Sequence, residues 1–153
     1  MAKNILMVLP NYGFDPTEAA IPWQLLTKAG YCVVFATPNA QMAAADRLML
    51  SGEGLDVWAN VPVLQNIKLV GLMLRANQAA RSAYSAMIKD ANFQQPLSYE
   101  QLDINDFAGV VFPGGHDKAI KPYLESESLR QFVRKLFPQT GGEPIMPVAA
   151  ICH

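Results

Sequence analysis

Residues 5–9 read Ile5-Leu6-Met7-Val8-Leu9, a short unbroken apolar run that ends at the turn residues of 10–13. Such a run is typical of a β-strand buried on both faces, as in a parallel sheet. The next residues, Asp15-Pro16-Thr17-Glu18, have the chemistry of a helix start: a capping aspartate, a proline in the first turn and a glutamate at capping-box spacing. We predict a helix to about Lys28 and a second strand at 31–36, which together make a right-handed strand–helix–strand unit of an α/β fold.

The same alternation returns near the end of the sequence. A strand is predicted at 107–112, a helix at 124–136 and a strand at 144–151. The segment of about 38–106 interrupts this rhythm and is interpreted as an insertion within one domain of residues 1–153. Inside it we expect short strands at 48–50 and 57–58, and a helix across about 64–89, where apolar residues recur at steps of three and four.

Composition narrows the class of protein. Hydrophobic residues make up 51% of the 153 residues and charged residues 16%, which is opposite to the balance of a disordered chain. The net charge of −1 gives no basic excess for nucleic acid or an anionic membrane. The run at 5–9 is too short for a signal peptide or a membrane span, and two cysteines fit a reducing compartment. We therefore expect a cytoplasmic protein with no nucleic-acid or membrane partner.

Groups with chemical potential follow three of the predicted strands. Glu18 lies after the first strand, Gly114-Gly115-His116 after the strand at 107–112, and Cys152-His153 after the last. Ligands of an open parallel sheet bind beyond the carboxyl ends of its strands, so these groups could form one site. A thiol at a strand-to-helix turn is activated by the helix dipole, although Cys152 could equally be a small buried residue.

The other candidates also have structural alternatives. The two glycines could offer backbone N–H groups to a developing oxyanion, or only form a tight turn. Glu18 could hydrogen-bond a thiolate as a protonated carboxyl, or only cap its helix. His116 and His153 could each be a general base or an ordinary surface residue. Cys32, inside a predicted strand, is interpreted as structural, and no cofactor or metal is expected because the sequence has no clustered ligand motif.

Three motifs, Asp15-Pro16-Thr17-Glu18, Phe112-Pro113-Gly114-Gly115-His116-Asp117 and Ala150-Ile151-Cys152-His153, occur in the order found in the ThiJ/PfpI superfamily, which the whole chain resembles. The resemblance implies a flavodoxin-like α/β sandwich with a mostly parallel sheet and Cys152 on a nucleophile elbow. It implies that Glu18 hydrogen-bonds the thiol, that Gly115 donates to an oxyanion and that His153 is the base. It also implies that the carboxyl-terminal part of the fold, on the order of 60–80 residues, is missing after His153.

Three functions are compatible with these residues. The first is a cofactor-independent enzyme of the glyoxalase III type, which converts dicarbonyls such as methylglyoxal to hydroxy acids through Cys152, Glu18 and His153. The second is a cysteine peptidase or amidohydrolase of the PfpI type, working through an acyl-thioester. The third is a holdase chaperone or redox sensor without enzymatic activity, which would bind unfolded polypeptide through a methionine-rich insertion. Low charge and apolar character favour a homodimer.

Overall fold

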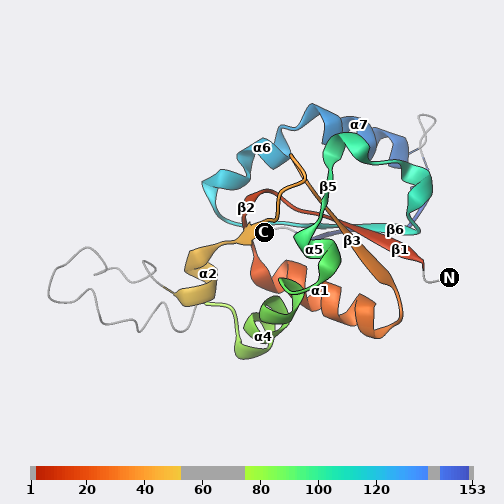
Figure 1. Cartoon of the computed structure of the whole chain (residues 1–153). Helices are drawn as coiled ribbons and strands as arrows, with labels where there is room; N and C mark the ends of the chain where they lie inside the picture. The colour runs from red at the N-terminus through yellow and green to blue at the C-terminus, as the bar shows by residue number, and fades with distance from the viewer. Residues whose placement is uncertain (1–2, 53–74, 138–141, 152–153) are drawn as a thin grey trace, which may run out of the picture.

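The computed structural model describes residues 3–52, 75–137 and 142–151. Its centre is a sheet of five parallel strands in the order β5-β3-β1-β6-β7, as Figure 1 shows. These strands are β1 (Asn4–Val8), β3 (Cys32–Thr37), β5 (Leu97–Ser98), β6 (Gly109–Pro113) and β7 (Val148–Ile151). A second, two-stranded sheet pairs β2 (Tyr12–Phe14) with β4 (Ala44–Ala45). The predicted flavodoxin-like α/β architecture is confirmed.

Helices cover both faces of the large sheet. On one face lie α1 (Pro16–Lys28) and α4 (Gln78–Met87), and on the other lie α6 (Lys121–Leu124) and α7 (Glu127–Leu136) (Figure 1). Successive residues of β1 alternate between the two faces. Ile5 and Met7 therefore pack in the core beneath α1, whereas Leu6 and Val8 pack in the core beneath α7. The unbroken apolar run of the sequence is explained by this burial on both sides.

The region between β3 and β6 differs in part from the prediction. The expected strand at 48–50 is wrong, because α2 (Arg47–Ser51) occupies these residues. The side chain of Asp46 accepts a hydrogen bond from the Leu48 N–H at 2.8 Å, which caps the helix and favours it over a strand. The expected strand at 57–58 lies outside the described residues.

The helix expected across 64–89 is shorter in its described part. It begins at Gln78, because the side chain of Asn77 caps it by accepting from the Ala80 N–H at 2.9 Å. Residues 64–74 lie outside the described residues. Beyond α4, the chain forms α5 (Ala91–Gln94), β5 and two 3-10 helices at Tyr99–Gln101 and Ile104–Asp106. Much of the segment interpreted as an insertion thus packs onto the central sheet.

Boundaries near the end of the sequence also shift. The helix expected at 124–136 is α7, which begins at Glu127 because the side chain of Ser126 caps it by accepting from the Leu129 N–H. Leu124 is instead the last residue of α6. The last strand starts at Val148 rather than 144. Pro144 and Pro147 cannot donate to a strand ladder, which explains the later start. In the described part of the chain, no helix is long and apolar enough to cross a bilayer.

Candidate active site

Glu18 is a buried carboxylate in the first turn of α1, with 6% of its surface exposed. The turn is fixed by Asp15, whose Oδ1 atom accepts hydrogen bonds from the N–H groups of Thr17 at 2.7 Å and Glu18 at 3.3 Å. This cap leaves the Glu18 side chain at the carboxyl end of β6. There its Oε2 atom accepts a hydrogen bond from the Gly114 N–H at 2.7 Å. A short bond to a carboxylate in a buried setting is among the stronger hydrogen bonds of proteins.

The peptide groups around Gly114 join β6 to the start of α1. While its N–H donates to Glu18, the carbonyl oxygen of Gly114 accepts from the Asp15 N–H at 2.9 Å. Both bonds come from residues of the same helix start. The carboxyl end of β6 and the beginning of α1 are therefore held in one fixed arrangement.

Gly115 is required for the close approach of two turns. A Cβ atom at this position would lie 2.4 Å from the carbonyl oxygen of Gly13 and 3.0 Å from the Cα atom of Phe14. Any larger residue would push the 113–116 turn away from the start of α1. The structure thus gives Gly115 a packing reason as well as a possible chemical one.

The two glycines differ in what their N–H groups can do. The N–H of Gly114 already donates to Glu18, whereas no described residue accepts a hydrogen bond from the N–H of Gly115. Gly115 therefore has the N–H that could serve an oxyanion. His116 follows in an exposed bend before the short 3-10 helix Lys118–Ile120.

Cys152 and His153 lie outside the described residues. The described part of β7 runs parallel to β6, with Ile151 in register with Pro113, the residue before Gly114. The strand thus leads toward the edge of the sheet where Glu18 and Gly114 meet. The structure brings together Glu18, Gly114 and Gly115, and it shows β7 directed to the same edge.

Cys32 lies at the amino ends of the strands, opposite the end where Glu18 and Gly114 meet. It is the first residue of β3 and is in register with Asn4, the first residue of β1. Its half-buried Sγ atom accepts a hydrogen bond from Asn92 at 3.4 Å. This placement at the amino ends of the strands agrees with a structural role.

Tyr99 is a residue near the site that sequence reasoning missed. Its hydroxyl donates a 2.6 Å hydrogen bond to the carbonyl oxygen of Leu9, just beyond β1. Burial, with a smaller contribution from Tyr123, raises the pKa of Tyr99 far above its ordinary value, so the hydroxyl remains a donor. The contact joins residues 90 positions apart, and no local pattern could have revealed it.

Across residues 3–52, 75–137 and 142–151, no group of three or more histidine, cysteine, aspartate or glutamate side chains is placed to hold a metal ion.

Comparison with known proteins adds three findings. A family model described as ThiJ/PfpI family-like matches residues 9–153. The uncharacterized protein C14C4.04 of Schizosaccharomyces pombe is 28% identical over 137 residues, which cover 88% of this chain and 45% of that protein. The chain thus spans about half the length of this curated relative.

Solved structures share the fold at low sequence identity. A ThiJ/PfpI domain protein from Brachyspira murdochii is 13% identical with a TM-score of 0.57, and the match covers 97% of this chain and 58% of that one. Glyoxalase III from Candida albicans is 16% identical with a TM-score of 0.58, and the match covers 99% and 57%. The family model spans nearly the whole sequence, including the turns that bear Glu18 and Gly115. The chain therefore belongs to the ThiJ/PfpI-like family.

Proposed function

We propose that this chain carries the reactive centre of a cysteine-dependent enzyme of the glyoxalase III type. Its substrates would be small dicarbonyls such as methylglyoxal, its products hydroxy acids, and it would need no cofactor. The observation that carries the proposal is the buried Glu18 carboxylate, hydrogen-bonded to Gly114 at the edge of the sheet toward which β7 runs. The sequence continues from β7 directly into Cys152.

The first step is addition of the Cys152 thiolate to the aldehyde carbon of the substrate. A carbon–sulfur bond forms, and the π electrons of the carbonyl group move to its oxygen, giving a hemithioacetal oxyanion. The N–H of Gly115, which no described residue uses, would stabilise this charge. Glu18, which is buried, would donate a hydrogen bond to the sulfur as a protonated carboxyl group.

The second step moves a proton within the adduct. His153 or Glu18 removes the hydrogen on the former aldehyde carbon and returns a proton to the neighbouring carbon. The oxygen of that second carbon takes the proton that the thiol gave up on ionising, so its carbonyl group becomes an alcohol. The first carbon is thereby oxidised to a thioester while the second is reduced. Water then hydrolyses the thioester, which releases the hydroxy acid and the free thiol. Substrate plus water equals product, so no external oxidant or reductant is needed.

The experiment compares the two cysteines of the chain. Loss of methylglyoxal and formation of lactate are followed with the wild type, Cys152→Ala and Cys32→Ala. Removing a covalent nucleophile usually lowers the rate of an enzyme by several orders of magnitude. We therefore expect Cys152→Ala to lower the rate by at least ~10³-fold. Cys32→Ala should keep the wild-type rate, because Cys32 lies at the amino ends of the strands and the proposed site lies at their carboxyl ends.

Equal rates in wild type and Cys152→Ala would contradict the proposal. Release of labelled amine from peptide or glutamine substrates, lost in Cys152→Ala, would indicate a hydrolase instead. Suppression of aggregation that survives Cys152→Ala would indicate a chaperone role.

A further inference from the structure

The turn after β6 contains two peptide groups on which the proposed reaction depends. The Pro113–Gly114 peptide group supplies the N–H that binds Glu18, and the Gly114–Gly115 peptide group supplies the N–H assigned to the oxyanion. Glycine, which has no Cβ atom, restricts the rotation of the adjoining peptide groups less than any other residue. The orientation of these two groups therefore depends on the hydrogen bonds that hold their polar atoms.

The Pro113–Gly114 peptide group is held from both faces of the sheet. Its N–H donates to the Oε2 atom of Glu18, on α1, at 2.7 Å. Its carbonyl oxygen accepts a hydrogen bond from the hydroxyl group of Tyr123, on α6, at 3.5 Å. The N–H and the carbonyl oxygen of a trans peptide group point in opposite directions. One planar unit thus connects α6 to α1, which lie on opposite faces of the sheet (Figure 1).

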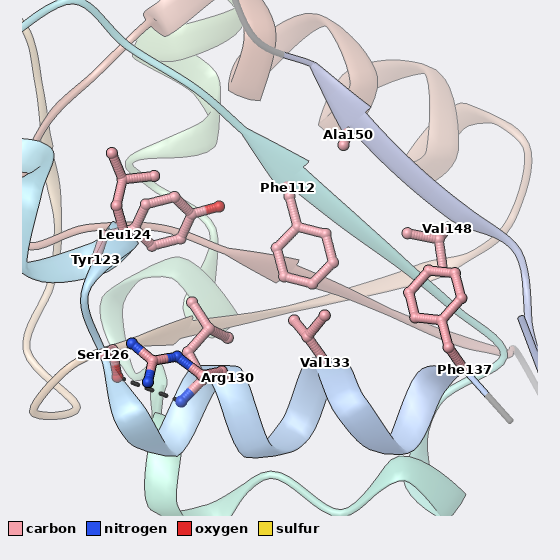
Figure 2. Close-up of a pocket in the computed structure, with 10 residues that line it drawn as sticks. Phe112, Tyr123, Leu124, Ser126, Arg130, Val133, Phe137, Val148 and Ala150 are labelled. Carbon is pink, nitrogen blue, oxygen red and sulfur yellow. Dashed lines mark hydrogen bonds between the residues drawn. The ribbon is translucent and has the colours of Figure 1, made fainter. Parts of the chain in front are cut away.

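Packing fixes the position of the Tyr123 hydroxyl group. The residue is 7% exposed, and its ring contacts that of Tyr99 with the ring centroids 6.5 Å apart. Figure 2 shows the Tyr123 side chain beside Phe112 of β6, with its hydroxyl oxygen on the side that faces Phe112. Tyr99 is fixed in turn by its hydrogen bond to the Leu9 carbonyl oxygen. Because buried side chains are closely packed, the hydroxyl group can move little from the Pro113 carbonyl oxygen.

The bond from Tyr123 is long, so its effect is on orientation more than on stability. Its 3.5 Å lies beyond the usual range for O–H···O hydrogen bonds, about 2.5–3.0 Å, and its share of the free energy of unfolding is small. Hydrogen bonds in a chain polarise one another, however, by about 10–30% per bond. Donation to the Pro113 carbonyl oxygen therefore strengthens the Gly114 N–H as a donor to Glu18 and opposes rotation of the peptide group.

We propose that Tyr123 is a positioning residue for the reactive centre, which acts on Glu18 through the Pro113–Gly114 peptide group. Its part in the reaction rests on the proposed function. Because Oε2 accepts from Gly114, the proton that a protonated Glu18 donates to the sulfur of Cys152 would lie on Oε1. The orientation of the peptide group thus determines which oxygen of Glu18 serves the sulfur. Rotation of this group would also turn the next one, whose N–H is that of Gly115.

The test compares Tyr123→Phe with Tyr99→Phe in the 153-residue chain. Each substitution removes one buried hydroxyl group and keeps the ring, so the packing of the core is conserved in both. The NMR resonance of the Gly114 amide proton reports on its hydrogen bond to Glu18, because a stronger hydrogen bond moves an amide proton downfield. We expect Tyr123→Phe to move this resonance upfield and Tyr99→Phe to leave it in place.

Tyr99→Phe is a matched control because it removes the shorter bond, 2.6 Å against 3.5 Å. Its loss of stability in urea unfolding should be at least as large as that of Tyr123→Phe. The bond of Tyr99 is to the Leu9–Pro10 peptide group, which has no N–H and so cannot pass the polarisation on. If Tyr123 affected only stability, Tyr99→Phe would move the Gly114 resonance as much as Tyr123→Phe does.

The rate of methylglyoxal loss is the second measurement. In Tyr123→Phe, kcat should fall ~2–5-fold with KM unchanged, whereas Tyr99→Phe should keep the wild-type kcat. A Gly114 resonance that Tyr123→Phe leaves in place, or that Tyr99→Phe moves equally, would overturn the proposal, and so would a moved resonance with an unchanged kcat. Equal rates in wild type and Cys152→Ala would count against the proposed function alone. The Gly114 resonance would then decide by itself whether Tyr123 positions the contact between Gly114 and Glu18.

Discussion

Both backbone polar groups of Gly114, its N–H and its carbonyl oxygen, form hydrogen bonds with residues at the start of α1. These two bonds determine how much a substitution at the site should lower stability. Glu18 accepts the N–H, and the Asp15 N–H donates to the carbonyl oxygen. All three residues are buried. Losing one partner of a buried hydrogen bond costs more than the bond itself contributes, because the other partner remains away from water without a substitute.

Substitutions at Glu18 should separate the hydrogen bond from the charge. Glu18→Ala removes the acceptor of the buried Gly114 N–H and should lower the free energy of unfolding by about 1–3 kcal/mol. Glu18→Gln keeps an acceptor oxygen and should cost less. Urea unfolding measures both, with the exposed Glu100→Ala as a control expected within about 0.5 kcal/mol of wild type. If Glu18→Gln is destabilised as strongly as Glu18→Ala, charge rather than the hydrogen bond to Gly114 dominates.

At the scale of the elements, the turn that follows β6 lies close to the turn between β2 and α1. This close approach is possible because Gly115 has no side chain. Gly115→Ala would place a Cβ atom 2.4 Å from the Gly13 carbonyl oxygen. The two turns must separate, which we expect to cost about 1–3 kcal/mol by urea unfolding. The separation would also lengthen the Glu18–Gly114 hydrogen bond. Under the proposed function Cys152 lies beside Glu18, so the pH dependence of the rate at which Cys152 is alkylated should change in this variant.

Gly30→Ala provides the comparison for that variant. Gly30 has a φ of +86° but nothing within 4 Å of an added Cβ atom, so its cost is backbone strain alone, about 1–2 kcal/mol. It should leave Cys152 alkylation unchanged. An unaltered alkylation profile in Gly115→Ala would mean that the turn adjusts without disturbing Glu18.

Elements with an unambiguous local signal could be predicted from the sequence. Elements whose residues fit both a strand and a helix could not. The apolar run at 5–9 and the Asp15 cap fixed β1 and α1, because both signals lie within the elements themselves. Leu48-Met49-Leu50 fits a strand or a helix equally well, and the Asp46 cap decides for a helix. The start of α7 at Glu127, rather than at 124, depends in the same way on one capping side chain, that of Ser126.

The site followed a similar rule. Parallel strands put their carboxyl ends at one edge, so the proximity of Glu18 to the glycine pair could be expected. Which glycine donates to Glu18 depends on the register of β6 and on the contact between Gly115 and Gly13, and neither has a sequence signature. Tyr99 could not be foreseen, because its role depends on a contact with Leu9 across the fold.

For the molecule as a whole, stability at high pH should depend on Tyr99. Burial raises the pKa of Tyr99 in the folded state. The hydroxyl therefore contributes its full stabilisation at pH values below the pKa of the unfolded chain, which is about 10. Above that pH the unfolded chain loses the phenolic proton while the folded chain keeps it. The free energy of unfolding of the wild type should then fall by about 1.4 kcal/mol per pH unit from this group alone.

Tyr99→Phe removes both the hydrogen bond to Leu9 and this pH dependence. Near pH 8 it should be about 1 kcal/mol less stable than wild type, because the Leu9 carbonyl oxygen loses its donor. As the pH rises from 10 to 11 the difference should shrink, since other groups titrate alike in both proteins. Urea midpoints at pH 8, 10 and 11 measure this, with Tyr31→Phe as the control because Tyr31 is 39% exposed. A constant difference across that range would show that the Tyr99 hydroxyl ionises equally in the folded and unfolded chain, which its burial against Leu9 argues against.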